Sequence, residues 1–395
     1  MKINTDQKKI DELLDRGVEN IFPKREFLAE KLRKGERLTM YLGIDPTGPT
    51  LHLGHAINLM RLKRFQDLGH RIILLIGSFT AMIGDPTDKA ATRKPLTREQ
   101  VLENCEKYKE QASLFLNFEG ENPAELKFND EWLGKLNFGE ILEIAGHLTV
   151  QQLLERDMFE KRMDDGKAIG LHEFLYPLMQ GYDSVAMDVD GEIGGNDQTF
   201  NMMIGRDLLK SMKNKEKFVL TNRLLVDPTG AKMGKTTGNM ITFDDSPTEM
   251  FGKIMAWTDG MIVPGFELCT FQGDFQSAEK RLQAGENPRD LKMELAESIV
   301  AIYHSSEDAQ KAKQNFIDMF SKKETPEEMP EFSLAGKNIV DCLVESGLAK
   351  SKSEARRTVE QGGVSVNEIV STDFELVLSA GDIIKKGKRF FIKIK

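Results

Sequence analysis

The chain has 395 residues, of which 40% are hydrophobic and 30% are charged, and its formal net charge is −9. This length predicts two or three domains, and the composition is ordinary for a water-soluble globular protein. The longest apolar stretch, IILLIG followed by SFTAMIG, is too short and too polar to cross a bilayer, so we expect no membrane partner.

The three cysteines, Cys105, Cys269 and Cys342, are far apart and form no CxxC pair. This spacing argues against a disulfide framework and against a thiolate zinc site, and it is typical of a reducing compartment. The first residues, MKINTDQKKIDELLDRG, contain neither a signal-peptide core nor an Arg-rich transit pattern. We therefore expect a cytoplasmic protein.

In residues 1–243, short apolar stretches alternate with helical patterns. The stretches predicted as buried strands are LTMYLGID (38–45), RIILLIGS (71–78), ELKFND (125–130), SVAMDVDG (184–191) and FVLTNRLLV (218–226). Strands that alternate with helices predict a Rossmann-like α/β domain with a mostly parallel sheet. Ligands of such sheets bind beyond the carboxyl ends of the strands, so we expect the functional residues there.

The pattern changes near Ser246, where SPTE predicts a helix start with a capping box. The sequence predicts an α-helical domain over 246–321, a charged linker with two prolines over 322–333, and a small α+β domain over 334–395. Residues 334–395 contain 11 Lys or Arg and 8 Asp or Glu, a net charge of +3, which leaves −12 for residues 1–333. A basic C-terminal domain on an acidic chain indicates a polyanionic partner.

The stretch DPTGPTLHLGH (45–55) places His52 and His55 in the first turn of a predicted helix, on one face. Gly54 between them allows another group to approach the backbone closely. A helix N-terminus has unpaired N–H groups and suits a phosphate. Two alternatives remain open at this point: a metal pair, which lacks a third ligand at metal-like spacing, and two solvated or capping histidines.

The stretch GAKMGKTTGN (230–239) is a glycine-rich loop with Lys232, Gly234, Lys235 and Thr236. Two ammonium groups and a hydroxyl on a loop that glycines allow to close are suited to a polyphosphate. It is not a Walker A loop, because that pattern needs a glycine where the chain has Thr229. The alternative is a solvated surface loop, and the preceding phosphate-type site makes that alternative weaker.

The stretch YPLMQGYD places Tyr176, Gln180 and Asp183 on one face of a predicted helix, where they would line a polar pocket or face solvent. In GEIGGNDQTFN (191–201), Asp197 and Gln198 open a helix, as a cap or as partners of a ribose hydroxyl. TAMIGDPTDKAATRK adds four more polar residues beyond the second strand, the last two on a basic loop: Thr80, Asp85, Lys89 and Arg93.

HLGH followed by KMGKT resembles the paired signatures of class I aminoacyl-tRNA synthetases. YLGIDPTGPTLHLGH, YxxxQxxD, GGNDQ and GAKMGKT, in this order, are similar to those of the bacterial-type tyrosyl-tRNA synthetases, and the resemblance covers essentially the whole chain. The C-terminal domain resembles the small RNA-binding "S-four" domain, named after a ribosomal small-subunit protein. There are departures: Gly234 and Thr236 replace serines of the general class pattern, and Leu42 cannot make a polar ribose contact that some family members make.

The resemblance implies ATP-dependent attachment of L-tyrosine to tRNA(Tyr) through a tyrosyl-adenylate, with pyrophosphate released. It implies ATP as a substrate with Mg²⁺ brought by the nucleotide, no protein-bound metal, and a homodimer. Tyr41 and Asp183 would bind the substrate phenol. The ammonium group and backbone of tyrosine would contact Tyr176, Gln180, Asp85 and Thr80, and Gln198 would help to place the carboxylate.

For the other ligands the resemblance also names residues. Asp45 would lie near the adenylate, Asp197 and Gly195 at the ribose, and His55 and Gly54 against the nucleotide. The polyphosphate would be held by Thr47, His52, Lys89, Arg93, Lys232, Lys235 and Thr236. The helical domain would bind the anticodon arm, and the basic residues expected to contact tRNA in the C-terminal domain are Lys352, Arg356, Arg357, Lys388 and Arg389.

The sequence leaves three alternatives to this function. A tryptophanyl enzyme is disfavoured by Tyr41, by Asp183 and by the C-terminal domain. A small-molecule adenylyltransferase shares HxGH sites but is usually shorter and lacks an RNA-binding domain. A regulatory RNA-binding protein that kept the fold without catalysis would be expected to lose HLGH and KMGKT, which are intact here.

Overall fold

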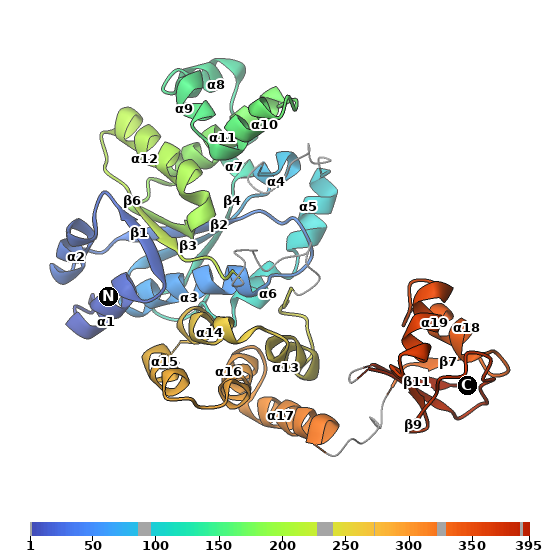
Figure 1. Ribbon diagram of the computed structural model, residues 1–395. Coiled ribbons are helices and arrows are strands. Elements are labelled where there is room, and N and C mark those ends of the chain that lie inside the picture. Colours follow the sequence, from blue (N-terminus) through green and yellow to red (C-terminus); the bar gives the residue numbers. More distant parts are fainter. Residues whose placement is uncertain (1, 86–95, 227–239, 272, 322–328, 388–389) are drawn as a thin grey trace. The chain divides into compact units, whose positions relative to one another are not determined.

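The computed structural model describes residues 2–85, 96–226, 240–271, 273–321, 329–387 and 390–395 (Figure 1). The chain forms two compact units, Met1–Lys313 and Gln314–Lys395. The first unit contains the predicted α/β sheet and most of the predicted helical domain, and the second contains a smaller sheet with two helices. The predicted fold class is therefore confirmed, while the predicted domain limits remain predictions.

The first unit is organised around a six-stranded sheet with the order β1-β6-β5-β2-β3-β4. All neighbouring strands are parallel except β1 and β6, which are antiparallel. The strands are β1 (Val18–Phe22), β2 (Thr39–Ile44), β3 (Arg71–Ile76), β4 (Glu125–Phe128), β5 (Gly191–Gly195) and β6 (Phe218–Asn222). The central strands β2, β3, β5 and β6 are short and mostly buried, as strands of a parallel sheet covered by helices are, whereas the edge strands β1 and β4 are partly exposed.

The strand order reverses direction at β2. The chain passes from β2 to β3 and β4 on one side and then returns to place β5 on the other side, where Tyr41 of β2 pairs with Glu192 of β5. Such a switch point opens a crevice beyond the carboxyl ends of the central strands. The polar residues that follow β2, β3 and β5 therefore meet at one edge of the sheet.

The predicted strand over SVAMDVDG is wrong. Helix α11 (Leu171–Met187) continues through the first half of this stretch and ends at Asp188, which has the left-handed conformation with φ 51°. Val185 packs with Ile204 and Leu208 of α12 (Thr199–Lys213), so these apolar residues serve a helix–helix contact. The strand is the following GEIGG, whose alternation is hidden because three of its five residues are glycine.

The remaining helices that precede α11 lie before, between and after the first four strands. They are α1 (Gln7–Asp15), α2 (Arg25–Arg33), α3 (Leu53–Asp67), α4 (Thr80–Ile83), α5 (Arg98–Cys105), α6 (Tyr108–Ala112), α7 (Asp130–Leu133), α8 (Phe138–Ala145), α9 (Val150–Leu154) and α10 (Asp157–Asp164). Helix α3 packs on β2, β3 and β5, and α12 packs on β5 and β6, on opposite sides of the sheet (Figure 1). In the part of the chain that the structure describes, no helix is long and apolar enough to cross a membrane.

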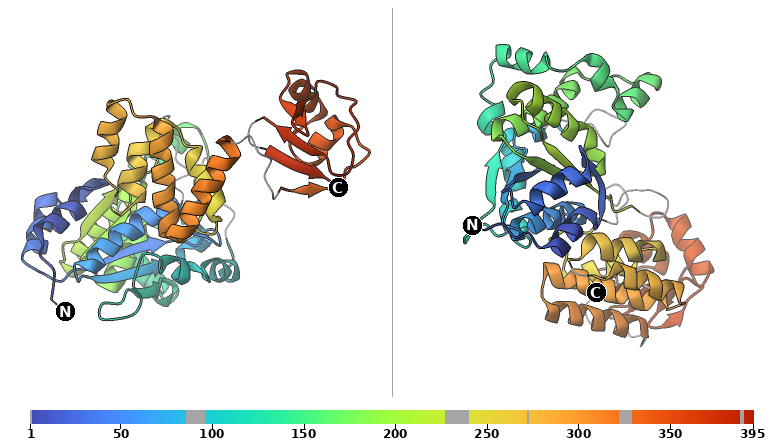
Figure 2. Two further views of the ribbon diagram at one scale, coloured as in Figure 1. Left: turned by 90° about the horizontal axis from the view of Figure 1, so that it is seen from below. Right: turned by 90° about the vertical axis from the view of Figure 1, so that its left-hand side faces the viewer.

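A second group of helices follows the sheet domain. It consists of α13 (Pro247–Met255), α14 (Ile262–Cys269), α15 (Phe275–Gln283), α16 (Pro288–Tyr303) and α17 (Ser306–Ser321). The predicted capping box is confirmed, since the Ser246 hydroxyl accepts from the Glu249 N–H and the Glu249 carboxylate accepts from the Ser246 N–H. Helices α13–α16 lie together at one end of the first unit, in yellow and orange (Figure 2), and α14 contacts α3.

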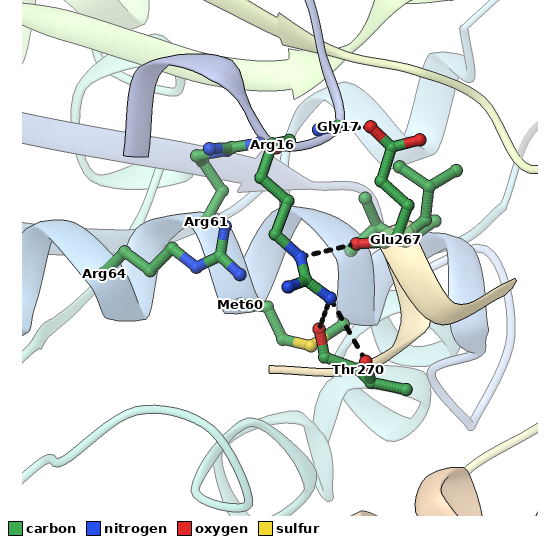
Figure 3. Close-up of a pocket in the computed structure, with 9 residues that line it drawn as sticks. Arg16, Gly17, Met60, Arg61, Arg64, Glu267 and Thr270 are labelled. Atoms are coloured by element: carbon green, nitrogen blue, oxygen red, sulfur yellow. Dashed lines mark hydrogen bonds between the residues drawn. The ribbon is translucent and has the colours of Figure 1, made fainter. Parts of the chain in front are cut away.

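Arginines line a small pocket between α1, α3 and α14, where Arg16 binds α14 and Arg61 binds α1 (Figure 3). Arg16 donates to the backbone carbonyls of Glu267 (2.9 Å) and Thr270 (3.2 Å), near the C-terminus of α14. Arg61 donates to the Leu13 carbonyl in the last turn of α1, and burial lowers the pKa of Arg61 to about 9. Cations are favourable at helix C-termini, where carbonyls lack partners, so this pocket joins helices together.

The second unit contains a five-stranded sheet with the order β7-β11-β10-β8-β9. Its elements are β7 (Glu331–Phe332), α18 (Ile339–Glu345), α19 (Lys352–Glu360), β8 (Val364–Val366), β9 (Ile369–Val370), β10 (Ile383–Lys386) and β11 (Phe390–Ile394). β7 pairs in parallel with β11 and the other pairs are antiparallel. Ile339, Leu343, Val359 and Ile384 belong to its core, which is formed without residues of the first unit.

Candidate active site

The two histidines of HLGH form the N-terminus of α3. His52 is the N-cap: its Nδ1 accepts from the Gly54 N–H (3.1 Å), and the His55 Nδ1 accepts from the His52 N–H (3.2 Å). The two rings stack with centroids 3.9 Å apart. Because both Nδ1 atoms accept, a neutral imidazole at either position carries its proton on Nε2. One of the two alternatives left open by the sequence was that the histidines cap the helix. The Nδ1 atom of each ring does so.

The chain that follows the KMGKT stretch returns to this helix. Ile241 accepts from the Leu53 N–H at 3.1 Å, and the Phe243 N–H donates to Leu51 at 3.0 Å. The first residues described after 239 therefore lie beside HLGH. The predicted phosphate ligands Lys89, Arg93, Lys232, Lys235 and Thr236 lie outside the described residues.

Asp45 follows β2 at the carboxyl edge of the sheet and accepts two hydrogen bonds. Its Oδ1 accepts from the Thr80 hydroxyl (2.7 Å) and its Oδ2 from the Tyr176 hydroxyl (2.8 Å). Gly77 is required here, since a Cβ at this position would lie 1.9 Å from the Asp45 Oδ1 and 2.5 Å from the Thr80 hydroxyl. Burial, reinforced by the Asp45 carboxylate, raises the pKa of Tyr176, so its phenol stays a donor.

Tyr41 and Asp183 form a buried polar end of the site, with exposures of 0% and 2%. The Asp183 carboxylate accepts from the Trp132 indole (2.7 Å) and from the Asn129 amide (3.2 Å). Both donors stabilise the ionised carboxylate, although burial raises the pKa of Asp183 well above its usual value. A carboxylate has acceptor positions for further donors, so this end of the site suits a ligand hydroxyl.

A chain of hydrogen bonds connects the other predicted tyrosine ligands. Asn201 donates to the side-chain oxygens of Gln180 (2.9 Å) and Gln198 (3.2 Å). Gln198 in turn donates to Asp85 at 2.7 Å, and Arg156 donates to the other Asp85 oxygen at 2.7 Å. The structure therefore brings Gln180, Gln198 and Asp85 together, as predicted, and adds two residues that hold them.

The remaining predicted nucleotide residues are at the same edge of the sheet. Thr47 is partly exposed just after β2, and its N–H donates to the Asp45 carbonyl at 2.8 Å. Gly195 ends β5, and a Cβ there would lie 2.5 Å from the Asp197 carboxylate. Asp197 belongs to the short 3₁₀ turn Asn196–Gln198 that leads into α12. Gly54 is exposed in the first turn of α3.

Sequence reasoning missed several residues that hold the site. They are Asn129, Trp132, Arg156, Ser184, Glu192, Asn201 and Lys217. Asn129 lies at the carboxyl end of the stretch predicted as a strand (125–130) and Trp132 comes two residues after it, so the expectation of functional residues at the carboxyl ends of strands could have identified both. Glu192 and Lys217 are charged residues in or beside buried strands, which is a second signal, because an unpaired buried charge is costly.

Neither the cysteines nor the carboxylates form a described metal cluster. Within the residues that the structure describes, no group of three or more His, Cys, Asp or Glu is placed to hold an ion. The three thiols are free.

In the second unit, Lys352, Arg356 and Arg357 are exposed on α19. Lys352 pairs with Asp341 at 2.7 Å. Lys388 and Arg389 lie outside the described residues. Exposed apolar side chains accompany these cations in the same unit, with Ile369 on β9 and Phe390 on β11 both more than half exposed.

The comparisons with known proteins agree with this geometry. The family model of tRNA synthetases class I (W and Y) matches residues 33–321, and that of the tyrosine–tRNA ligase SYY-like C-terminal domain matches residues 322–394. The fold and the site thus define a class I tRNA synthetase.

Relatives with similar sequences show to which family within the class I tRNA synthetases the chain belongs. Tyrosine–tRNA ligase 2 of Vibrio parahaemolyticus is 45% identical over 388 residues, 96% of this chain and 97% of the relative. Tyrosine–tRNA ligase 2 of Clostridium acetobutylicum is 42% identical over 400 residues, 98% of this chain and 99% of the relative. The chain belongs to the tyrosine–tRNA ligase family, as the resemblance predicted.

Solved structures share the fold. A tyrosyl-tRNA synthetase of Archaeoglobus fulgidus, complexed with L-tyrosine, is superimposable with a TM-score of 0.62 at 23% identity, over 78% of this chain and 99% of that one. A truncated mitochondrial tyrosyl-tRNA synthetase of Coccidioides posadasii gives a TM-score of 0.64 at 24% identity, over 78% of this chain and 92% of that one.

Proposed function

We propose that this chain attaches L-tyrosine to tRNA(Tyr) at the expense of ATP, in two steps. Tyrosine is first joined to AMP with release of pyrophosphate, and the tyrosyl group is then transferred to the terminal ribose of the tRNA. The observation that supports this choice of amino acid is the pair formed by Tyr41 and Asp183 at the buried end of the site. The C-terminal domain and the relatives also favour the tyrosyl over the tryptophanyl enzyme.

In the proposed pocket, the Asp183 carboxylate accepts the phenolic proton of tyrosine and the Tyr41 hydroxyl contacts its oxygen. Phenylalanine would not supply the hydroxyl that Tyr41 and Asp183 would contact in addition to their partners within the protein, and tyrosyl enzymes are the usual illustration of how strongly such a site rejects it. Polar residues near the other end of the substrate would bind its ammonium and carboxylate groups: Thr80, Asp85, Tyr176, Gln180 and Gln198. Asp45 would keep Thr80 and Tyr176 in place through the hydrogen bonds described above.

Adenylation needs little proton chemistry from the protein. The tyrosine carboxylate is already ionised and attacks the α-phosphate in line, so the protein contributes position and neutralisation of charge on the phosphates. His52 and His55 would donate their Nε2 protons at the N-terminus of α3, where the helix dipole also favours an anion. The other proposed polyphosphate ligands are Thr47, Lys89, Arg93, Lys232, Lys235 and Thr236, with Mg²⁺ brought by ATP.

The nucleoside would lie over Gly54 and beside β5. Gly54 has no side chain, and a Cβ there would be 3.0 Å from the His52 ring, so there is little space for a side chain at this position. Asp197 is at the carboxyl edge of β5, next to Gly195, and would accept hydrogen bonds from ribose hydroxyls. Asp45 would lie close to the adenylate formed between the two substrates.

We propose that tRNA binds the helical region α13–α17 and the C-terminal unit. Lys352, Arg356 and Arg357 are exposed on one helix of that unit and suit phosphates, and the exposed aromatic ring of Phe390 in the same unit suits stacking on an unpaired base. Lys388 and Arg389 would extend this surface. Because tRNA is made and used in the cytoplasm, a cytoplasmic location is part of this proposal.

The proposal includes a homodimer. Phe138 and Leu142 of α8, Val150 of α9, Met163 of α10 and Leu171 of α11 are all more than half exposed, and these helices lie together (Figure 1). Exposed apolar patches of this kind mark interfaces, and a second copy would bury this one. Sedimentation as a monomer at micromolar concentrations would contradict the dimer.

The experiment that tests the function is ATP–pyrophosphate exchange with each amino acid supplied separately. We expect exchange with tyrosine, and none above background with tryptophan or without an amino acid. Asp183→Asn should lower kcat/KM for tyrosine by about 100-fold, because a buried charged acceptor is lost, while ATP binding is retained. Exchange driven by tryptophan would refute the function.

A further inference from the structure

Behind the Tyr41 hydroxyl lies a group of buried polar side chains to which the reaction described above gives no role. Ser184 of α11 and Lys217, the residue before β6, are 0% exposed, and Glu192 of β5 is 2% exposed. A fully buried lysine is rare and needs a partner. These three residues come from three different elements and meet at one point.

Hydrogen bonds link this group to the proposed pocket at two places. The Lys217 ammonium donates to the Ser184 hydroxyl (2.8 Å) and to one oxygen of Glu192. The Ser184 and Tyr41 hydroxyls are 2.9 Å apart. The other oxygen of Glu192 accepts from the Gln180 amide at 3.0 Å. The ion pair thus contacts Ser184, the hydrogen-bonding partner of Tyr41, and Gln180, another residue of the proposed pocket.

Space for the ammonium group depends on a glycine. Gly205 of α12 lies against Gly181 of α11, and a Cβ at Gly205 would be 2.6 Å from the Lys217 Nζ and 2.9 Å from the Ser184 hydroxyl. The two glycines let the helices approach closely, and Lys217 fills the remaining space. The arrangement is therefore built into the packing of the two helices.

The chemistry of the donors fixes the direction of the hydrogen bonds. An ammonium group only donates, so the Ser184 oxygen must accept from Lys217. The Ser184 proton then has one hydrogen-bonding partner among the described residues, the Tyr41 oxygen. If Tyr41 donated to Ser184 instead, the buried Ser184 proton would have no acceptor, which costs free energy.

A Tyr41 hydroxyl that accepts a hydrogen bond from Ser184 must donate its own proton to a different acceptor. Burial raises the pKa of Tyr41, and the Glu192 carboxylate raises it further through its charge and as a hydrogen-bond acceptor, so the phenol keeps this proton and its acceptor within the protein is Glu192. Asp183 lies on the same helix as Ser184, one residue earlier, and its carboxylate is also buried. A ligand hydroxyl between Tyr41 and Asp183 would accept from the first and donate to the second.

We propose that Lys217 and Ser184 are positioning residues for tyrosine recognition: because Ser184 donates to the Tyr41 oxygen, the Tyr41 proton is not held by Ser184 and is donated to the phenolic oxygen of the substrate, instead of to Glu192, when tyrosine is bound. This inference rests on the proposed tyrosine pocket. The relay runs from the Lys217 ammonium to Ser184, from Ser184 to Tyr41 and from Tyr41 to the substrate. With phenylalanine bound, the Tyr41 proton has no ligand oxygen to reach and remains with Glu192, so only tyrosine gains the hydrogen bond that Ser184 makes possible.

The test is a double-mutant cycle of Ser184→Ala and Tyr41→Phe, measured by ATP–pyrophosphate exchange with tyrosine and with phenylalanine. Ser184→Ala should lower the tyrosine-to-phenylalanine ratio of kcat/KM by about tenfold, through a higher KM for tyrosine with little change in kcat. In the Tyr41→Phe background, the same substitution should change this ratio by less than about twofold. Ser211→Ala in α12 is the control, because its hydroxyl only donates to a backbone carbonyl.

Three results would decide against the relay. If Ser184→Ala lowers kcat/KM for both amino acids equally, or has the same effect in both backgrounds, Ser184 has only a packing role. If Tyr41→Phe itself leaves the ratio unchanged, the proposed pocket is wrong, and the relay is refuted with it. Should Ser184→Ala fail to fold, Lys217→Met is the second variant: it frees Ser184 to accept from Tyr41 and should lower the same ratio, and an unchanged ratio would refute the relay.

Discussion

The buried end and the phosphate end of the proposed site hold their polar groups by different means. At the buried end, Tyr41 and Asp183 are at most 2% exposed, and each has a hydrogen-bonding partner within the protein. At the phosphate end, His52 and His55 are partly exposed and are held by the backbone of a helix N-terminus.

The difference follows from what each end has to recognise. A neutral hydroxyl is distinguished from its absence only if the protein groups around it are buried and already oriented, since exposed groups would bind water instead. A polyphosphate is strongly charged, and cations and helix dipoles attract it even beside solvent. Selectivity is thus placed in the interior and charge neutralisation at the surface.

The largest expected effect comes from a substitution that impairs only the phosphate end of the proposed site. Lys235→Ala should lower the rate of tyrosyl-adenylate formation by about 100- to 1,000-fold, because a cation that neutralises developing charge is lost. Tyrosine binding, measured by calorimetry, should be unchanged. Lys8→Ala, at an exposed position of α1, is the control and should keep full activity. An equal loss of tyrosine binding would contradict the separation of the two ends.

The second largest effect is expected from a substitution that impairs only the buried end of the proposed site. Gly205→Ala forces a methyl group against Lys217 and Ser184 and should lower the free energy of unfolding by about 1–3 kcal/mol, with a higher KM for tyrosine. Gly252→Ala in α13 is the matched control: its Cβ meets nothing within 4 Å, and alanine in a helix should raise stability by about 0.5–1 kcal/mol. Urea unfolding measures both, and equal shifts would contradict the tight packing at Gly205.

The smallest effect tests burial of a titratable group far from both ends. His70 lies before β3, at the amino edge of the sheet; its Nδ1 accepts from the Leu38 N–H, and burial lowers its pKa to about 4. The unfolded chain binds a proton near pH 6.5 and the folded chain does not, so stability is full above that pH and falls as the pH drops toward 4.

Between pH 7 and pH 5 this histidine should account for a loss of about 2 kcal/mol in the free energy of unfolding. His70→Asn keeps an acceptor for the Leu38 N–H and removes the titration, so its stability should depend less on pH over this interval. His147→Asn, at an exposed histidine, should behave like the unsubstituted chain. Urea unfolding at both pH values compares them, and parallel losses in all three would refute the role of His70.

Sequence patterns predicted the parallel sheet, the helix that begins at HLGH and the capping box at Ser246, because each depends on neighbouring residues. They failed at SVAMDVDG, since a short apolar run is compatible with a strand or with a helix packed on another helix. The face shared by Tyr176, Gln180 and Asp183 was predicted from helical spacing. The residues that hold this face, such as Asn129 and Asn201, come from other elements and were missed.

By itself the sequence determined the family, and it predicted a site at the carboxyl edge of the strands together with the chemical groups available there. Local motifs and helical periodicity are sufficient for this. Only the tertiary structure decided which groups pair with one another, because Tyr41, Ser184 and Lys217 are separated by up to 176 positions and meet through strand order and helix packing. The direction of a buried hydrogen bond depends on every neighbour of the group, and those neighbours are assembled only by the fold.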